Sequence, residues 1–152
     1  MIDLYAELRS VVQALDRARV AHALVGGLAV SIYTTPRATQ DIDIVVARDD
    51  LERGVTALTD IGFRRAGEPM PVAGGRLQIQ RLVKTDGADL LPVDLLVPLD
   101  PTLTGLLNDR SVVEWENCRL FIIGLPSLRA LKRLRGSAQD RADLEALGPD
   151  PT

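Results

Sequence analysis

Three aspartates in this sequence are placed where carboxylates could hold metal ions. Asp41 and Asp43 are separated by one residue in a strand-like run that extends to Val46. Because side chains two apart on a strand share a face, with Cα atoms roughly 6.5 to 7 Å apart, both carboxylates should converge on one ion or on two neighbouring ions. Two ionised carboxylates this close repel each other, and a divalent cation removes the conflict.

Asp94 is the third candidate ligand. It stands in the most apolar stretch of the chain, where a buried charge is costly unless something pairs with it. In a two-metal arrangement the ions lie about 3.5 to 4 Å apart, and a third carboxylate holds the second ion and takes a proton from the nucleophile. Oxygen-only ligands select a hard cation, so we expect two Mg²⁺ ions, with Mn²⁺ as an alternative.

The residues that precede the aspartate pair are suited to phosphate. Gly26 and Gly27 lack Cβ atoms, so a triphosphate can approach the backbone closely, and the helix that should follow presents unpaired N–H groups. Arg37 and Thr39 could add a charge and a hydroxyl donor at the same place, and Ser31 is a weaker candidate. We therefore expect a phosphate cradle beside a metal site.

These motifs together resemble a known superfamily. The glycine pair, the Asp41-x-Asp43 unit and the distant Asp94 resemble the polymerase-beta-type nucleotidyltransferases. Two stretches are similar to the AbiEii and MenT branch of minimal nucleotidyltransferase toxins. The first is Leu24 to Val30 followed by Arg37-x-Thr39. The second is Leu128-x-x-Leu131-Lys132 followed by Arg135 and Asp140-x-x-Asp143-Leu144.

The resemblance implies a Mg²⁺-dependent enzyme that transfers a nucleoside monophosphate from an NTP such as ATP to an acceptor and releases pyrophosphate. It implies that Asp41 and Asp43 ligate both ions, and that Asp94 ligates one and helps to deprotonate the acceptor. It also implies that the glycine pair holds the triphosphate and that Lys132 reaches it from the C-terminal helices.

For the acceptor and the partners, a toxin-like role is the leading hypothesis and there are two alternatives. A toxin-like role would make tRNA or another macromolecule the acceptor and would add a cognate antitoxin. A small hydroxyl compound, as in antibiotic-modifying relatives, is the second possibility. A nucleotide-binding module with weak catalysis is the third, because the wider superfamily often has Gly-Ser where this chain has Gly26-Gly27. The short C-terminal part suggests that a partner or a homodimer helps to recognise the acceptor.

The elements that must position these residues form an α+β pattern, in which helices pack on one face of a mixed, polymerase-beta palm-like sheet and two short helices close the chain. Helical spacing of apolar residues, helix caps and Gly or Pro breaks predict helices at 3–15, 28–33, 51–58, 127–135 and 139–147. Strands are expected at 21–25, 41–46, 77–84, 88–97, 112–115 and 119–123, and a loop at 69–75. Pro92 should confine its part of a strand to an edge or a bulge.

Composition sets the remaining limits. The 152 residues fit a single domain, which we place at 1–148, with a flexible tail at 149–152. A net charge of −3 provides no global positive field for nucleic acid. Cys118 is the only cysteine, which excludes an internal disulfide and a multi-cysteine zinc site. The absence of a leader-like start and of membrane-length apolar stretches predicts a cytoplasmic protein without membrane contact.

Each motif also has a purely structural interpretation. An Asp-x-Asp unit can be a solvated strand edge, a Gly-Gly pair is usually a turn, and Asp94 could be a buried residue held by backbone N–H groups. The basic residues near 129–135 could form a solvated helix face. Their occurrence together at this spacing is what favours a functional site.

Overall fold

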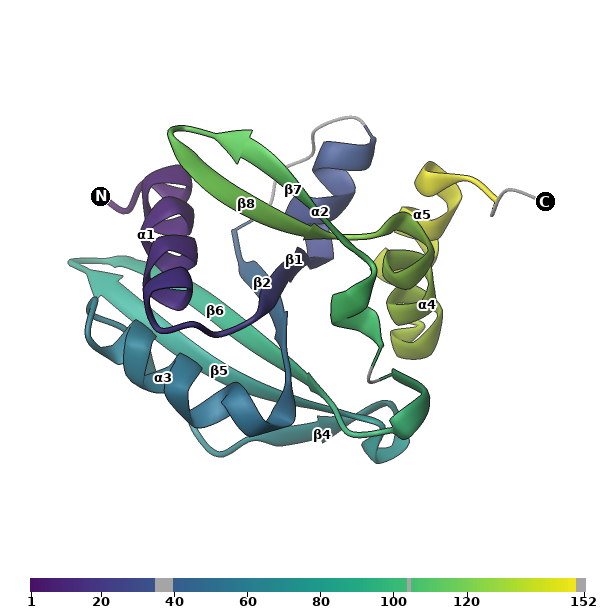
Figure 1. Cartoon of the computed structure of the whole chain (residues 1–152), viewed down its shortest axis with the longest axis horizontal. Coiled ribbons are helices and arrows are strands. Elements are labelled where there is room, and N and C mark those ends of the chain that lie inside the picture. Colours follow the sequence, from purple (N-terminus) through teal and green to yellow (C-terminus); the bar gives the residue numbers. More distant parts are fainter. Residues whose placement is uncertain (35–39, 104, 150–152) are drawn as a thin grey trace.

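An eight-stranded mixed sheet forms the centre of the computed structural model, which describes residues 1–34, 40–103 and 105–149 (Figure 1). The helices are α1 (Leu4–Arg17), α2 (Gly26–Tyr33), α3 (Leu51–Thr59), α4 (Leu125–Arg135) and α5 (Ala138–Leu147). The strands are β1 (His22–Val25), β2 (Ile42–Val46), β3 (Arg64–Arg65), β4 (Met70–Val72), β5 (Leu77–Asp86), β6 (Asp89–Pro98), β7 (Arg110–Trp115) and β8 (Cys118–Ile123).

The strand order is β3-β5-β6-β2-β1-β8-β7, and β4 pairs with β5 outside this path. Strand β2 lies antiparallel to β1 and parallel to β6, and β1 lies parallel to β8. The β5–β6 and β7–β8 pairs are antiparallel hairpins. The predicted α+β class with a mixed sheet is therefore confirmed.

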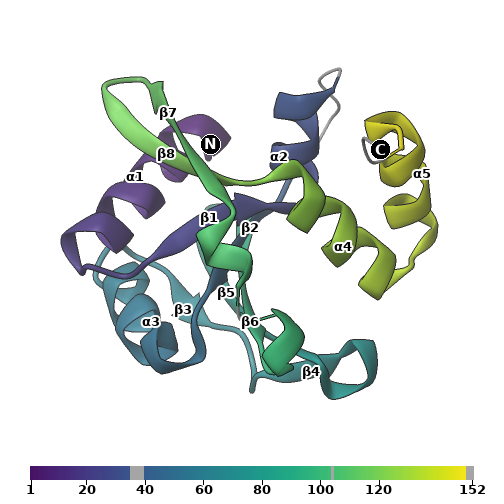
Figure 2. The same ribbon diagram turned by 45° about the vertical axis from the view of Figure 1, so that its right-hand side comes forward.

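The helices lie on both sides of the sheet (Figure 2), because the two C-terminal helices cover the side opposite α1 and α3 and the packing is not on one face alone. Figure 2 shows α1 and α3 together on one side, and α4 and α5 together on the other. Helix α1 begins at the predicted N-cap Asp3, whose side chain accepts hydrogen bonds from the N–H groups of Tyr5 and Ala6. Its buried apolar stripe, which includes Val11 and Leu15, packs toward the sheet because helical spacing places these residues on one face.

The register of four neighbouring strands places one row of residues at the same level. Asp43 on β2 is paired with Val25 on β1 and with Asp94 on β6, and Asp94 is paired in turn with Arg81 on β5. Directly paired residues of a sheet share a face. Leu95, one residue beyond Asp94, packs near Gly54 of α3 on the opposite face. The row of polar side chains therefore faces the α4–α5 side.

The core that holds this arrangement is aliphatic. One cluster of buried Leu, Ile, Val and Ala side chains extends through the molecule, and Phe63 is its fully buried aromatic residue. In particular, Ile42, Ile44 and Val45 of β2 are completely buried. Burial of a side chain of this size contributes about 1.5 to 3 kcal/mol, so β2 is a rigid support for the aspartate that it carries.

Two details of the strands concern prolines. Residues 69–75 were expected to form a loop, but Met70–Val72 form β4, which pairs with residues 77–79 of β5. The strand is very short and contains Pro71, so its sequence carries no alternating pattern, and its pairing depends on the neighbouring long strand. Pro92 lies in the part of β6 that pairs with β5 alone, because pairing with β2 begins at Val93, which confirms its edge position.

In the ranges that the structure describes, no helix is long and apolar enough to cross a membrane. The tail predicted at 149–152 falls almost wholly outside the described residues, of which 149 is the last.

Candidate active site

Asp43 is at the centre of the candidate site and lies directly against the start of α2. Gly26, the first residue of α2, has a φ of +71°, and a Cβ atom added to it would lie 2.8 Å from both Cβ and Cγ of Asp43. The N-cap residue Val25 provides no side-chain cap, so the first turn of α2 has N–H groups available for an anion. Gly27, also buried, continues this turn. The two predicted glycines and the aspartate are thus brought together.

The charges around Asp43 oppose its ionisation. Burial, together with the nearby Asp94 and Asp41 carboxylates, raises the pKa of Asp43 to about 6, although Arg135 and Lys132 act to lower it. Three carboxylates therefore share one region of the sheet face, and the two cations compensate only part of their charge. A divalent cation placed there would favour the ionised form.

Asp94 has a partner that the sequence did not predict. Arg81 Nε and Nη2 donate to the two carboxylate oxygens of Asp94 at 2.8 and 2.9 Å. Asp94 is only 8% exposed, while the Arg81 side chain is half-exposed. The hydrogen bond to Asp94 raises the pKa of Arg81. This bidentate pair explains how a carboxylate is tolerated in an apolar strand.

The donor set fits a hard divalent cation held partly by its substrate. Among the described residues, no group of three or more His, Cys, Asp or Glu side chains is arranged to hold an ion. Mg²⁺, however, is usually bound by one or two carboxylates together with phosphates and waters. Asp41, immediately before β2, and Asp43 supply two such carboxylates. Asp94 could join them through the lone pairs that its pair with Arg81 leaves free.

A pocket of about 490 Å³ lies beside Asp94. Its volume is within the range typical of ligand sites. One wall comes from the β4–β5 region and the other from the junction of α4 and α5, and its lining includes Glu68, Met70, Ile79, Arg81, Asp94, Arg135, Ser137 and Asp140. The pocket therefore provides room for a substrate next to the paired aspartates.

Lys132, the residue expected to reach the triphosphate, is buried between α4 and α5. Its ammonium group lies 3.2 Å from Asp140 and 2.9 Å from Asp143. Although burial alone would raise the pKa of Asp140, hydrogen bonds from Ser137 and Lys132 and the charge of Arg135 hold it below its usual value. Arg135, at the end of α4, lines the pocket instead.

Ser31 is the one other predicted phosphate contact within the described residues, and it lies on α2. Ser31 donates its hydroxyl to the Gly27 carbonyl at 3.0 Å and lines a separate apolar pocket of about 230 Å³ with Tyr5 and Trp115. Arg37 and Thr39 lie outside the described residues.

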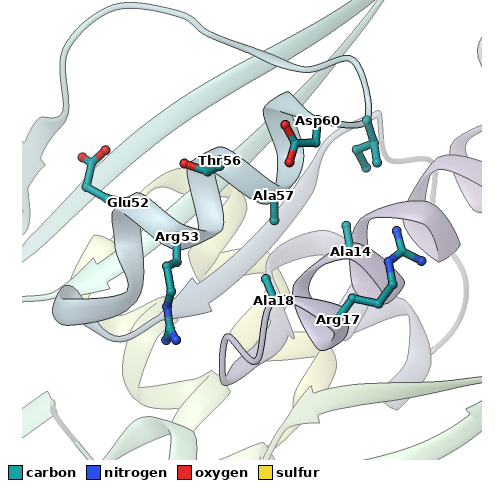
Figure 3. A pocket seen from close by; sticks show the side chains of 9 residues that line it. Ala14, Arg17, Ala18, Glu52, Arg53, Thr56, Ala57 and Asp60 are labelled. Carbon is teal, nitrogen blue, oxygen red and sulfur yellow. The ribbon is translucent and has the colours of Figure 1, made fainter.

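A wider pocket, of about 740 Å³, lies between α1 and α3 on the other side of the sheet. Figure 3 shows Ala14, Ala18 and Ala57 between the two helices, with Arg17 and Arg53 extending outward. Small residues let the helices approach each other, so this hollow reflects helix packing, and none of the predicted site residues lines it.

Comparisons by sequence find no matching family model and no matching curated protein. Comparisons by structure find several. A candidate nucleotidyltransferase from Thermotoga maritima superposes with a TM-score of 0.66 at 12% identity, covering 95% of this chain and 93% of that one. The lincosamide antibiotic adenylyltransferase LnuA, with lincomycin bound, gives 0.57 at 18% identity, covering 93% and 94%.

ANT(2″)-Ia, in complex with adenylyl-2″-tobramycin, gives a TM-score of 0.58 at 13% identity, covering 94% of this chain and 88% of that one. These likenesses extend over nearly the whole of each chain. The chain therefore has the nucleotidyltransferase fold that its motifs predicted.

Proposed function

We propose that this protein transfers a nucleoside monophosphate from an NTP to a hydroxyl group of an acceptor and releases pyrophosphate. The observation that supports this most strongly is the pairing of Asp43 with Asp94 on adjacent parallel strands, directly beside the first turn of α2. On a nucleotidyltransferase fold this arrangement combines an anion-binding helix start with carboxylates.

The nucleotide would bind at the start of α2. Gly26 and Gly27 allow its phosphates to approach the backbone, and the uncapped N–H groups of the first turn would donate to them. Arg37 and Thr39 remain candidates for the same phosphates. Because Gly27 replaces the serine of many relatives, the phosphates would be held there by backbone groups without a neighbouring hydroxyl.

Asp41 and Asp43 would hold Mg²⁺, or Mn²⁺, and Asp94 would contribute to a second ion. When bound, such ions neutralise charge on the phosphates and polarise the bond to the leaving group. The role of Asp43 requires its ionised form, which the neighbouring Asp94 disfavours without a cation. Arg81 would hold the Asp94 carboxylate in one orientation until substrates arrive.

In the proposed reaction one bond forms, one bond breaks and one proton is transferred. The acceptor oxygen forms a bond to the α-phosphorus, the bond from the α-phosphorus to the bridging oxygen of pyrophosphate breaks, and pyrophosphate leaves. The proton of the acceptor hydroxyl would pass to Asp94, which lines the pocket and is paired with Asp43 in the sheet. A hydroxyl group in this pocket would therefore lie beside its base.

A small hydroxyl compound is the acceptor class that the geometry supports best. The pocket beside Asp94 has the volume of a small-molecule site, and Glu68 and Asp140 add acidic groups to its lining. The net charge of −3 gives no general attraction for a polyanion. Two structural neighbours of almost the same length are described with lincomycin and with adenylyl-tobramycin.

A macromolecular acceptor such as tRNA, with a toxin role and a cognate antitoxin, is the second candidate. It is supported by the C-terminal motif of the toxin branch, because Lys132, Asp140 and Asp143 come together in one ion-pair network. A module that binds NTP without fast turnover is the third.

The experiment incubates the purified protein with each α-labelled NTP and Mg²⁺, in separate reactions with lincosamides, aminoglycosides and total RNA. We expect label in a small compound, and none with Asp43→Asn. Asp60→Asn, which removes an exposed carboxylate after α3, is the matched control and should behave as wild type. Label in RNA would select the second candidate. NTP binding without transfer would select the third.

A further inference from the structure

We infer that Arg135, and not Lys132, is the cation of the C-terminal helices that contacts the nucleotide phosphates, and that Lys132 is a positioning residue. This inference rests on the proposed function and assigns the phosphate contact within it. It departs from the motif resemblance, which gave that contact to Lys132.

The surroundings of Lys132 show why it is not available. The residue is 4% exposed, and its two carboxylate partners, Asp140 and Asp143, are 1% and 2% exposed. If the ammonium group left to meet a phosphate, two buried carboxylates would lose their counter-ion, which is strongly unfavourable. Lys132 therefore stays between α4 and α5.

Arg135 is held much more loosely. Its side chain is 34% exposed, and its Nε lies 3.7 Å from the Asp140 carboxylate, beyond hydrogen-bond distance. The same oxygen, Oδ2, already accepts hydrogen bonds from the Ser137 hydroxyl at 2.7 Å and from the Ser137 N–H at 3.2 Å. Asp140 is thus satisfied without Arg135, whose planar guanidinium can turn toward a phosphate and bind it through two N–H groups.

Arg135 lies both at the pocket beside Asp94 and near Asp43, the carboxylate beside which the triphosphate is expected. Arg81 and Arg135 are the two cations among the described residues that line the pocket beside Asp94, and Arg81 already donates to both oxygens of that carboxylate. Arg135 also lies close enough to Asp43 to lower its pKa, with a larger effect than that of Lys132. Arg135 therefore lies on the wall of the pocket opposite Asp94. Among the described residues, its guanidinium does not donate a hydrogen bond to Asp43 or Asp94.

The buried network explains how Arg135 keeps this position. Helix α4 ends at Arg135, Gly136 reverses the chain with a φ of +64°, and Ser137 caps α5 in a reciprocal capping box with Asp140. The ion pairs of Lys132 with residues on α5 then fix the two helices against each other. Lys132 acts on the site by holding the end of α4 in place.

Binding measurements with Mg²⁺ separate the two roles. The ligands are pyrophosphate, the four NTPs and the corresponding NMPs, followed by calorimetry. Because a charge-assisted contact to phosphate is lost, Arg135→Gln should weaken NTP and pyrophosphate binding by about 10-fold to 100-fold. NMP binding should stay within about twofold of wild type, because an NMP lacks the β- and γ-phosphates that Arg135 would contact. Arg135→Lys should recover part of the affinity.

Arg133→Gln is the matched control, because it removes the same charge from an exposed position of the same helix, and it should bind as wild type. Lys132→Met should lower the melting temperature, while its folded fraction keeps the preference for NTP over NMP. If Lys132→Met does not fold, the comparison of Arg135→Gln with Arg133→Gln decides alone.

Three results would overturn the inference while leaving the proposed function intact. Arg135→Gln could bind NTP as tightly as Arg133→Gln, it could lose NMP binding equally, or a folded Lys132→Met could lose the phosphate-dependent affinity instead. If wild type binds neither NTP nor pyrophosphate, the proposed function itself fails, and the inference fails with it.

Discussion

Gly26 and Asp43 are packed so closely that a Cβ atom on Gly26 would lie 2.8 Å from Cβ of Asp43. The start of α2 and the carboxylate on β2 therefore form one unit, which depends on a residue without a side chain. Since Gly26 also has a positive φ, two independent constraints act at the same position.

The first prediction is that Gly26→Ala destabilises the protein and removes nucleotidyl transfer. An alanine in this backbone conformation costs about 1 to 2 kcal/mol, and the overlap with Asp43 costs a further 1 to 3 kcal/mol, roughly. Gly87→Ala is the control, because Gly87 has a φ of +60° with open space around it. Urea unfolding should show the larger loss at Gly26. Equal losses for the two variants would contradict the close packing.

The second prediction concerns pH. Burial, with Asp94 and Asp41, raises the pKa of Asp43 from 3.8 to about 6, so folding favours the protonated acid. The contribution of the Asp43 carboxyl to stability should therefore be lost as pH rises between about 4 and 6. In metal-free buffer at pH 8, Asp43→Asn should be more stable than wild type by about 1 to 3 kcal/mol, and at pH 4 the gain should vanish.

The pH series needs only chemical denaturation of the two proteins at matched ionic strength. Asp60→Asn, at an exposed position, controls for a general effect of lost negative charge. If the difference in unfolding free energy between the two proteins does not change between pH 4 and pH 8, the pKa of Asp43 is not raised in the folded protein.

The third prediction is that Mg²⁺ stabilises wild type more than Asp43→Asn. A ligand that binds only the folded state at 100 times its Kd adds about 2.7 kcal/mol to the free energy of unfolding. The carboxylates of Asp41 and Asp43 supply the expected ligands, so removing one should remove most of this gain. Melting curves with Mg²⁺ or EDTA measure it, and equal shifts for both proteins would place the ion elsewhere.

The fourth prediction is that Lys132→Met costs about 3 to 5 kcal/mol, because two buried carboxylates lose their counter-ion. Arg133→Gln, at an exposed position of α4, should cost less than about 1 kcal/mol, as is usual for exposed charges. Equilibrium unfolding in urea measures both. A small effect at Lys132 would mean that the network contributes little to the packing of α5 on α4.

Much of the site could be predicted from the sequence because its parts are local. Strand alternation sets the positions of Asp41 and Asp43, and the glycine pair marks the start of a helix. The unusual aspartate in an apolar strand indicated that Asp94 needs a partner. The structure adds that Asp94 and Asp43 are direct neighbours in the sheet.

Arg81 was not predicted as the partner of Asp94 because the turn between their two strands lies at a different position from the one expected. Placing the turn at residues 85–87 would pair Lys84 with Ala88 and Arg81 with Leu91. The hairpin instead closes at residues 87 and 88, which pairs Asp86 with Asp89 and Arg81 with Asp94. A small shift of the turn thus changes which side chain faces the aspartate.

The burial of Lys132 could not be predicted for a different reason. Its basic neighbours on α4 suggested a solvated face, and the spacing of residues along one helix does not show what packs against it. The position of α5, fixed by the Ser137–Asp140 capping box and by Asp143, decides that Lys132 is enclosed. Such long-range packing appears only in the assembled fold.

Pyrophosphate release tests the central claim most directly. Wild type and Asp43→Asn are each incubated with the four NTPs, Mg²⁺ and a bacterial lysate fraction that supplies acceptors, and the pyrophosphate formed by the added protein is measured. We predict release by wild type and none above background by Asp43→Asn, whose fold should be at least as stable. Equal release by the two proteins, or NTP binding by wild type without any pyrophosphate, would contradict nucleotidyl transfer at this site.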